Sequence, residues 1–160
     1  MNACKGLAER LRRLLPGLWA GLLLCVALVA TPAPFALLQR PDAGRVVARI
    51  LAQEAYASLA LALLLLMLER LAARAAAEKR GASQFSLGMA LSAGALFCTI
   101  AGYFGVLPMM DAVRAGQAAP SFGLSFGKLH AVSAAFFGIK LLLVAALAWR
   151  AAGVRSAPSS

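Results

Sequence analysis

Hydrophobic residues fall along this chain in four long runs, separated by short polar or charged segments. The runs cover residues 14–38, 46–70, 85–106 and 126–149. A helix rises about 1.5 Å per residue, so each run can cross a hydrocarbon core about 30 Å thick. The pattern predicts an all-α fold, an integral membrane four-helix bundle, in which residues 1–160 form a single domain.

The last run, residues 126–149, carries two residues that do not suit lipid. Lys140 lies near its middle, and His130, the only histidine of the chain, lies near its start. On a helix that turns about 100° per residue, Ser133 and Phe137 share one face with them. An ammonium at the bilayer centre costs at least about 2.5 to 3.5 kcal/mol. We therefore expect the other helices to supply Lys140 with a partner or with water.

Glu54 is the first candidate partner for Lys140. On the second run it shares with Ser58 a helix side without basic residues, opposite Arg45 and Arg49. It also lies only about 12 Å from the expected helix start. Pairing with Arg49 or Arg45 in the headgroup layer is the preferred interpretation, and pairing with Lys140 is the alternative.

These residues suggest a polar site within the membrane. Glu54, His130 and Lys140 are hypothesised to line an outward-opening cavity, with Ser133 on the same face. A lone histidine is more often an ordinary interfacial residue, and this alternative stays open. Three further residues at the same end of the bundle are secondary candidates: Arg49, Tyr103 and Asp111.

Composition and charge favour a membrane protein over a nucleic-acid-binding one. The chain is 62% hydrophobic and has a formal charge of +10, but its basic residues lie at the ends of apolar runs and form no patch with aromatics. Four crossings place both termini on one side, which carries ten Lys and Arg residues against five on the other. This asymmetry predicts an inner-membrane protein with both termini in the cytoplasm.

The basic start followed by an apolar run would also suit a signal peptide. The one site that looks cleavable follows Ala33, and Pro34 is poorly suited to the position after a cut. We expect an uncleaved first span. Pro32 and Pro34 cannot donate backbone hydrogen bonds, so this span should kink or end early there.

Other segments carry simpler predictions. The charged stretch 69–83 is expected to be a solvated hairpin, and the third span is expected to end before Pro108, with a loop over residues 109–127. Small residues that repeat every four positions predict a packing face on the third span. They are Ala90, Gly94, Cys98 and Gly102.

No enzyme motif accompanies the candidate site. The sequence contains no C-x-x-C, H-E-x-x-H, G-x-S-x-G or Walker-type phosphate loop. Its three cysteines cannot form a complete disulfide framework, and a soft metal site between Cys25 and Cys98 would lack further ligands. We expect a noncatalytic protein with no cofactor and no bound metal.

Three stretches resemble a family of membrane proteins known as domain of unknown function 4149, akin to the transmembrane protein 205 type. They are GLWAGLLLCVALVATPAPFALL, DAGRVVARILAQEAY and FGKLHAVSAAFFGIK. The family's more usual His-Gly-x-Ser occurs here as His130-Ala131-Val132-Ser133. The resemblance implies a four-helix integral membrane domain and supplies no reaction.

The favoured function is to bind or pass a small solute, an ion or a partner through the face from His130 to Lys140. A haem-binding or redox subunit is an alternative, although His130 is the only histidine available as an axial ligand. A structural or assembly factor is another. An enzyme using His130 and Glu54 as an acid and base pair is the weakest reading. The expected partner is the lipid bilayer, and small-residue faces would also suit a homo-oligomer.

Overall fold

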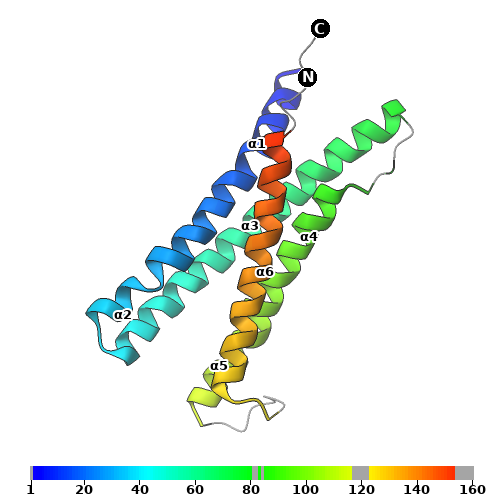
Figure 1. The fold of residues 1–160 in the computed structure, drawn as a ribbon. Helices are drawn as coiled ribbons and strands as arrows, with labels where there is room; N and C mark the ends of the chain where they lie inside the picture. Colours follow the sequence, from blue (N-terminus) through cyan, green and yellow to red (C-terminus); the bar gives the residue numbers. More distant parts are fainter. Residues whose placement is uncertain (1, 81–82, 84, 117–122, 154–160) are drawn as a thin grey trace.

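The computed structural model describes residues 2–80, 83, 85–116 and 123–153, and in them it contains helices and no strand. Within these residues, four helical segments are long and apolar enough to cross a membrane. Figure 1 shows them gathered into one bundle. The prediction of an all-α, four-helix membrane bundle is confirmed. The segments are Gly6–Leu37, Arg40–Glu78, Leu87–Arg114 and Phe126–Gly153.

Two of the four segments are built from several helical pieces. The first comprises α1 (Asn2–Cys25), a π-helix η1 (Val26–Ala30) and α2 (Ala33–Leu37). The second is a single helix, α3 (Arg40–Arg80). The third comprises α4 (Leu87–Thr99), a π-helix η2 (Ile100–Val106) and α5 (Leu107–Arg114), and the fourth is α6 (Phe126–Gly153).

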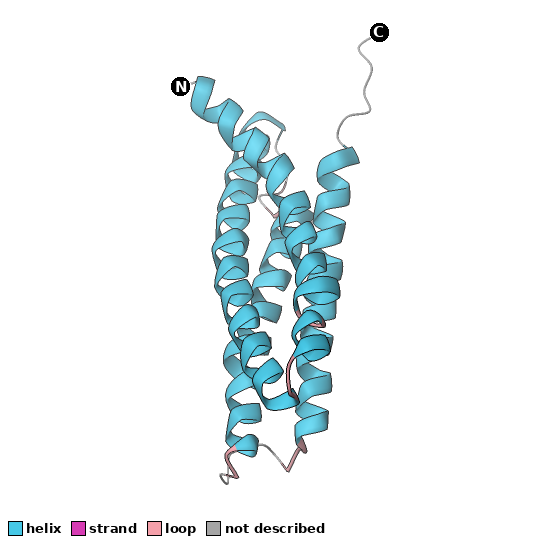
Figure 2. Cartoon of the chain, turned by 90° about the vertical axis from the view of Figure 1, so that its left-hand side faces the viewer, coloured by secondary structure: helices cyan, strands magenta, loops and turns pink. Residues whose placement is uncertain are grey.

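The four long helices form a ring in which neighbours along the chain are neighbours in space. α1 packs against α3, α3 against α4, α4 against α6, and α6 closes the ring against α1. Within the described residues, α3 and α6 do not pack directly and lie across a diagonal of the ring. The described ends of the chain lie at one end of the bundle in both views (Figures 1 and 2).

The main core lies in the half of the bundle nearest the chain ends. Trp19 and Leu23 of α1 are fully buried there, against Leu65 of α3 and Val144 of α6. Lipid is as apolar as a leucine side chain, so helices in a membrane associate through close packing. Small residues permit that closeness, and a Cβ added to Gly94 would lie 3.1 Å from Leu143 Cδ1.

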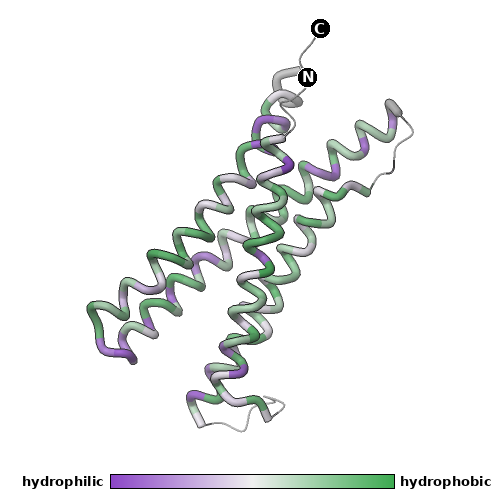
Figure 3. Tube along the Cα trace, viewed as in Figure 1, coloured by the Kyte–Doolittle hydropathy of each residue, from purple (hydrophilic) through white to green (hydrophobic). Residues whose placement is uncertain are grey.

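The other half of the bundle separates into two pairs of helices. There α2 contacts η1 and α3, whereas α5 contacts η2 and α6. Figure 1 shows α2 and the start of α3 diverging from α5 and the start of α6. A smaller core of Val106, Met110 and Leu129 holds the second pair together. Figure 3 shows apolar positions dominating the length of all four segments, with hydrophilic positions gathered mainly at their ends.

The break predicted at the paired prolines is present, and a π-helix precedes it. The backbone N–H of Thr31 donates to the Val26 carbonyl five residues earlier, at 3.0 Å. The Thr31 hydroxyl donates to the carbonyl of Ala27 at 3.2 Å. Proline has no N–H to continue the regular ladder, so the preceding turn widens and the helix restarts at Ala33.

The expectation of a solvated hairpin from residue 69 is wrong, because α3 continues to Arg80. Residues 69–80 contain Ala, Leu, Glu, Lys and Arg, which are strong helix formers, and no glycine or proline before Gly81. The third segment likewise passes Pro108, which occupies the first turn of α5, where its missing N–H does no harm. Of the predicted loop, residues 109–114 are helical, and residues 117–122 lie outside the described residues.

Candidate functional site

An ion pair crosses the interior of the bundle between α6 and α3. Lys140 Nζ lies 2.7 Å from Glu54 Oε1 and 2.9 Å from Glu54 Oε2. Lys140 is 4% exposed and Glu54 is 5% exposed. The helical period of α6 turns Lys140 inward together with Val144 and Leu147, which are also buried. The two charges therefore meet inside protein and away from lipid.

Two buried side chains extend this ion pair to α1. The Ser58 hydroxyl, one turn after Glu54 on α3, donates to Glu54 Oε1. The Trp19 indole N–H donates to the Ser58 hydroxyl at 2.9 Å. The carboxylate thus accepts from an ammonium and a hydroxyl, which satisfies the requirement that a buried charge be both paired and hydrogen-bonded.

An aromatic ring gives Lys140 a further contact. The ammonium lies 4.8 Å from the centre of the Phe137 ring, one turn earlier on α6. A cation over an aromatic face is attracted by the ring's quadrupole, whose face is negative, with a strength of about 0.5 to 2 kcal/mol. The ammonium has three N–H donors, and the carboxylate of Glu54 is its hydrogen-bond partner in the described residues.

The ion pair borders a cavity of about 50 Å³ between α3, the α4–η2–α5 segment and α6. One water molecule needs about 10 to 15 Å³ of such space, so the cavity can take a few waters or a small ion. Its lining carries both charges and several neutral polar groups. The polar and thiol side chains around it are Glu54, Cys98, Thr99, Tyr103, Ser133 and Lys140.

The structure brings some of the predicted site residues together and leaves others apart. Glu54, Lys140 and Ser133 line the cavity, and Tyr103 joins them from η2. His130 does not line it: this residue is exposed, and its ring stacks on Phe126 with centroids 6.3 Å apart. Lys140 and His130 are ten residues apart on α6, and His130 falls at the edge of the shared face.

The preferred pairing of Glu54 with Arg49 or Arg45 is wrong. Arg45 instead lies 3.4 Å from Asp42 at the surface, and Arg49 is exposed. Because α3 begins at Arg40, Glu54 lies almost four turns inside the helix and not two. The remaining secondary candidate, Asp111, forms a surface ion pair with Arg114 at 3.4 Å.

Two residues of the site were not among the predicted ones. Ser58 was placed on the correct side of its helix, and its spacing of four residues from Glu54 is the signal for a hydrogen bond between them. Trp19 gave only a weak signal, which is that a buried indole N–H usually finds an acceptor. In the described part of the chain no three potential metal ligands gather, and Cys25 is exposed whereas Cys98 is buried.

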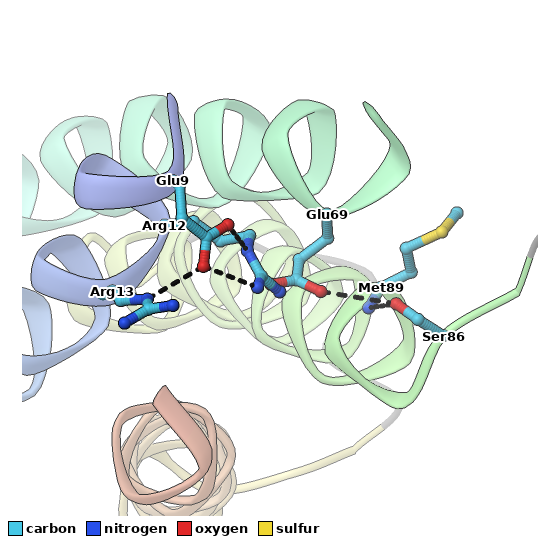
Figure 4. Close-up of polar contacts among 6 residues, drawn as sticks. All are labelled: Glu9, Arg12, Arg13, Glu69, Ser86 and Met89. Carbon is cyan, nitrogen blue, oxygen red and sulfur yellow. Dashed lines mark hydrogen bonds and ion pairs between the residues drawn. The ribbon is translucent and has the colours of Figure 1, made fainter. Parts of the chain in front are cut away.

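A second group of polar contacts lies near the chain ends, between α1, α3 and α4 (Figure 4). The Arg12 guanidinium bridges two carboxylates, with Nε 3.1 Å from Glu9 Oε2 and Nη1 3.1 Å from Glu69 Oε1. Ser86 caps α4 by accepting from the Met89 N–H at 3.1 Å, and its hydroxyl also lies 3.4 Å from Glu69 Oε2.

Gly88 allows the Glu69 carboxylate to reach this position. A Cβ built at Gly88 would lie 2.1 Å from Glu69 Oε2, much closer than two such atoms can approach. A helix glycine is normally less favourable than alanine, and here it makes room for a buried acid beside the start of α4.

Fold and site together define a multi-pass membrane protein with a buried ion pair in its helix bundle. A family model described as "Domain of unknown function (DUF4149)" matches residues 14–119. The chain therefore belongs to this family. The match includes Glu54 and ends before α6, so Lys140 and the resemblance noted in the fourth run lie outside it. No curated protein and no solved structure shows significant similarity to the chain.

Proposed function

We propose that this is a noncatalytic inner-membrane protein that binds or passes a small polar solute or ion at the Glu54–Lys140 cavity. The observation that carries the proposal is the buried ion pair at the wall of a cavity. Replacing a buried ion pair by apolar residues is often neutral or stabilising, so stability alone is a weak reason to keep one. Ionisable residues inside a membrane generally mark a functional pathway.

The distribution of charge supports an orientation with both termini in the cytoplasm. Ten of the sixteen Lys and Arg residues belong to the end that carries the termini, and five to the other end. Cytoplasmic ends of membrane spans carry such an excess. The end formed by α2 and α5 then faces away from the cytoplasm.

This orientation implies that the cavity opens outward. The cavity lies between α3 and α6, the two helices that separate toward the α2 and α5 end. Its lining residues Leu51, Leu107 and Ser133 are partly exposed. A solute would therefore arrive from the outer side and reach the ion pair without passing through the main core around Trp19.

Cavity size and chemistry narrow the class of solute. A volume of about 50 Å³ suits water and ions better than organic metabolites. A small cation would compete with the Lys140 ammonium for Glu54, and a small anion would compete with Glu54 for Lys140. The proposal is noncatalytic because His130 lies outside the cavity lining, so His130 and Glu54 do not form an acid and base pair there.

Two native cysteines make a matched test of water access. Cys98 lines the cavity, whereas Cys25 is exposed on α1 toward the lipid. One variant, Cys4→Ser with Cys25→Ser, leaves Cys98, and a second, Cys4→Ser with Cys98→Ser, leaves Cys25. Each is treated in right-side-out vesicles with silver nitrate in chloride-free buffer, since Ag⁺ is small and binds thiols. The thiols that remain free are counted with a maleimide after denaturation.

We expect Ag⁺ to block Cys98 and to leave Cys25 free. Equal protection of both thiols would show that the cavity is dry, and the proposal would fail. Adding Na⁺, K⁺ or nitrate in a concentration series then tests binding: one of them should slow the reaction of Cys98 in a saturable way. A reaction that none of these ions slows would leave only water in the cavity and would overturn the solute-binding function.

A further inference from the structure

A second cavity is lined by residues of α1, α3, α4 and α6, at the end of the bundle that carries the described ends of the chain. It also measures about 50 Å³, and three arginines reach it, Arg12 and Arg13 from α1 and Arg150 from α6. Among the residues that the structure describes, Glu69 is the one acid in its lining. Glu9, outside the lining, pairs with Arg12 and Arg13, so three positive charges stand against two negative ones. The group keeps a net positive charge, unlike the balanced pair at Glu54.

Much of the hydrogen-bonding capacity of these arginines is unused. Arg13 donates from Nε to Glu9 at 2.8 Å, and within the described residues both of its Nη groups lack a protein partner. Arg150 forms no ion pair or side-chain hydrogen bond in the same part of the chain. Arg12, by contrast, is held by Glu9 and Glu69. Guanidinium N–H groups without a partner in the described residues therefore border this cavity from two helices.

The floor of this cavity is apolar and belongs to the bundle core. Pro16 is fully buried, and Leu147 is 4% exposed. The arginines thus lie where the apolar part of the bundle ends, and this is the depth at which lipid phosphates are found. On the next turn of α1, Gly17 is exposed. A Cβ built there would meet no atom of a neighbouring helix within 4 Å.

We propose that the cavity formed by Arg13 and Arg150 binds a phosphate group, supplied by the headgroup of an anionic phospholipid. The planar guanidinium matches two phosphate oxygens at once and forms charge-assisted hydrogen bonds with them. Basic pockets between membrane helices on the cytoplasmic side recognise anionic headgroups for this reason. Arg12 serves as a positioning residue, because its ion pair with Glu69 fixes α1 against α3.

The test compares two double variants of the purified full-length protein. Arg13→Gln with Arg150→Gln removes the free donors. The control, Arg70→Gln with Arg74→Gln, removes two exposed arginines of α3 that lie at the same end of the bundle and do not line the cavity. Binding of phosphatidylglycerol and of phosphatidylcholine is followed by native mass spectrometry from mixed micelles. Circular dichroism and the melting temperature show whether each variant is folded.

We expect the first variant to lose about tenfold or more in affinity for phosphatidylglycerol, as charge-assisted hydrogen bonds are removed, and the control variant to lose much less. Equal losses in the two variants would indicate nonspecific attraction and would overturn the proposal, as would unchanged binding in the first. Millimolar inorganic phosphate is the second arm. If it displaces the lipid from the wild-type protein, the site accepts free phosphate as well; if it does not, the ligand is the lipid headgroup.

Discussion

Lys140 and Glu54 join the two helices of the bundle that do not pack against each other. Their side chains meet at 2.7 Å across the diagonal between α6 and α3. The Trp19–Ser58 hydrogen bond attaches α1 to the same carboxylate. The buried carboxylate of Glu54 therefore connects three of the long helices at a single level.

Removing one member of this pair should cost much more stability than removing both. Lys140→Met or Glu54→Gln alone leaves a buried polar or charged group unpaired, with an expected loss of about 3 to 5 kcal/mol in the free energy of unfolding. The double variant should recover a substantial part of that loss. Unfolding by increasing sodium dodecyl sulfate in mixed micelles measures all three, and losses that simply add would contradict a direct coupling.

The indole N–H of Trp19 should contribute to the stability of the fold, and that of Trp149 should not. Trp19→Phe keeps an aromatic ring but removes the donor to Ser58, for an expected loss of about 1 to 2 kcal/mol in the free energy of unfolding. Trp149 is 83% exposed, and Trp149→Phe is the matched control. Similar melting temperatures for the two variants would mean that the hydrogen bond to Ser58 contributes little.

Gly88 should not tolerate a methyl group while Glu69 is present. Gly88→Ala places a carbon where the carboxylate lies, so the carboxylate must move away from Arg12, with an expected destabilisation of about 1 to 3 kcal/mol. In a Glu69→Ala background the same change should be neutral or stabilising by up to about 1 kcal/mol, because alanine favours helix. Gly138→Ala, at an open position of α6, is the control. A loss that persists without Glu69 would point to a different cause.

A larger residue at position 133 should close the cavity beside the ion pair. Ser133 lines it, whereas the next residue, Ala134, is exposed. In the background that retains only Cys98, Ser133→Leu should strongly slow the reaction with Ag⁺, and Ala134→Leu should leave its rate close to that of the parent. If both variants react at the parent rate, Ag⁺ reaches Cys98 by a route that avoids Ser133.

The inward faces of the helices could be predicted because the helical period fixes them. Lys140, Ser133 and Phe137 fall on one face of α6, and Glu54 falls on the side of α3 without basic residues. The pairing of Lys140 with Glu54 was therefore one of the two interpretations that the sequence allowed. The sequence does not reveal which helices are diagonal, since that depends on packing around the ring. His130 shares the face only at its edge. It also lies near the start of α6, the part of this helix that diverges from α2 and α3.

The charged region after residue 68 was harder to predict for a different reason. Charge density suggested a solvated turn, whereas the helix-forming residues of α3 continue the helix past that point. Glu69 consequently lies at the side of a helix, 8% exposed, and meets Arg12 from the basic start of the chain. The partner of a buried acid can be far away in the sequence, and here 57 residues separate the two.

The separation of Glu54 and Lys140 along the chain also affects how the protein is made. Lys140 follows Glu54 by 86 residues, so the second and third spans have been synthesised before the lysine emerges from the ribosome. During that interval the carboxyl group of Glu54 has no ammonium to meet. The fourth span brings that ammonium, so its arrival both neutralises the buried charge of the second span and joins the two helices.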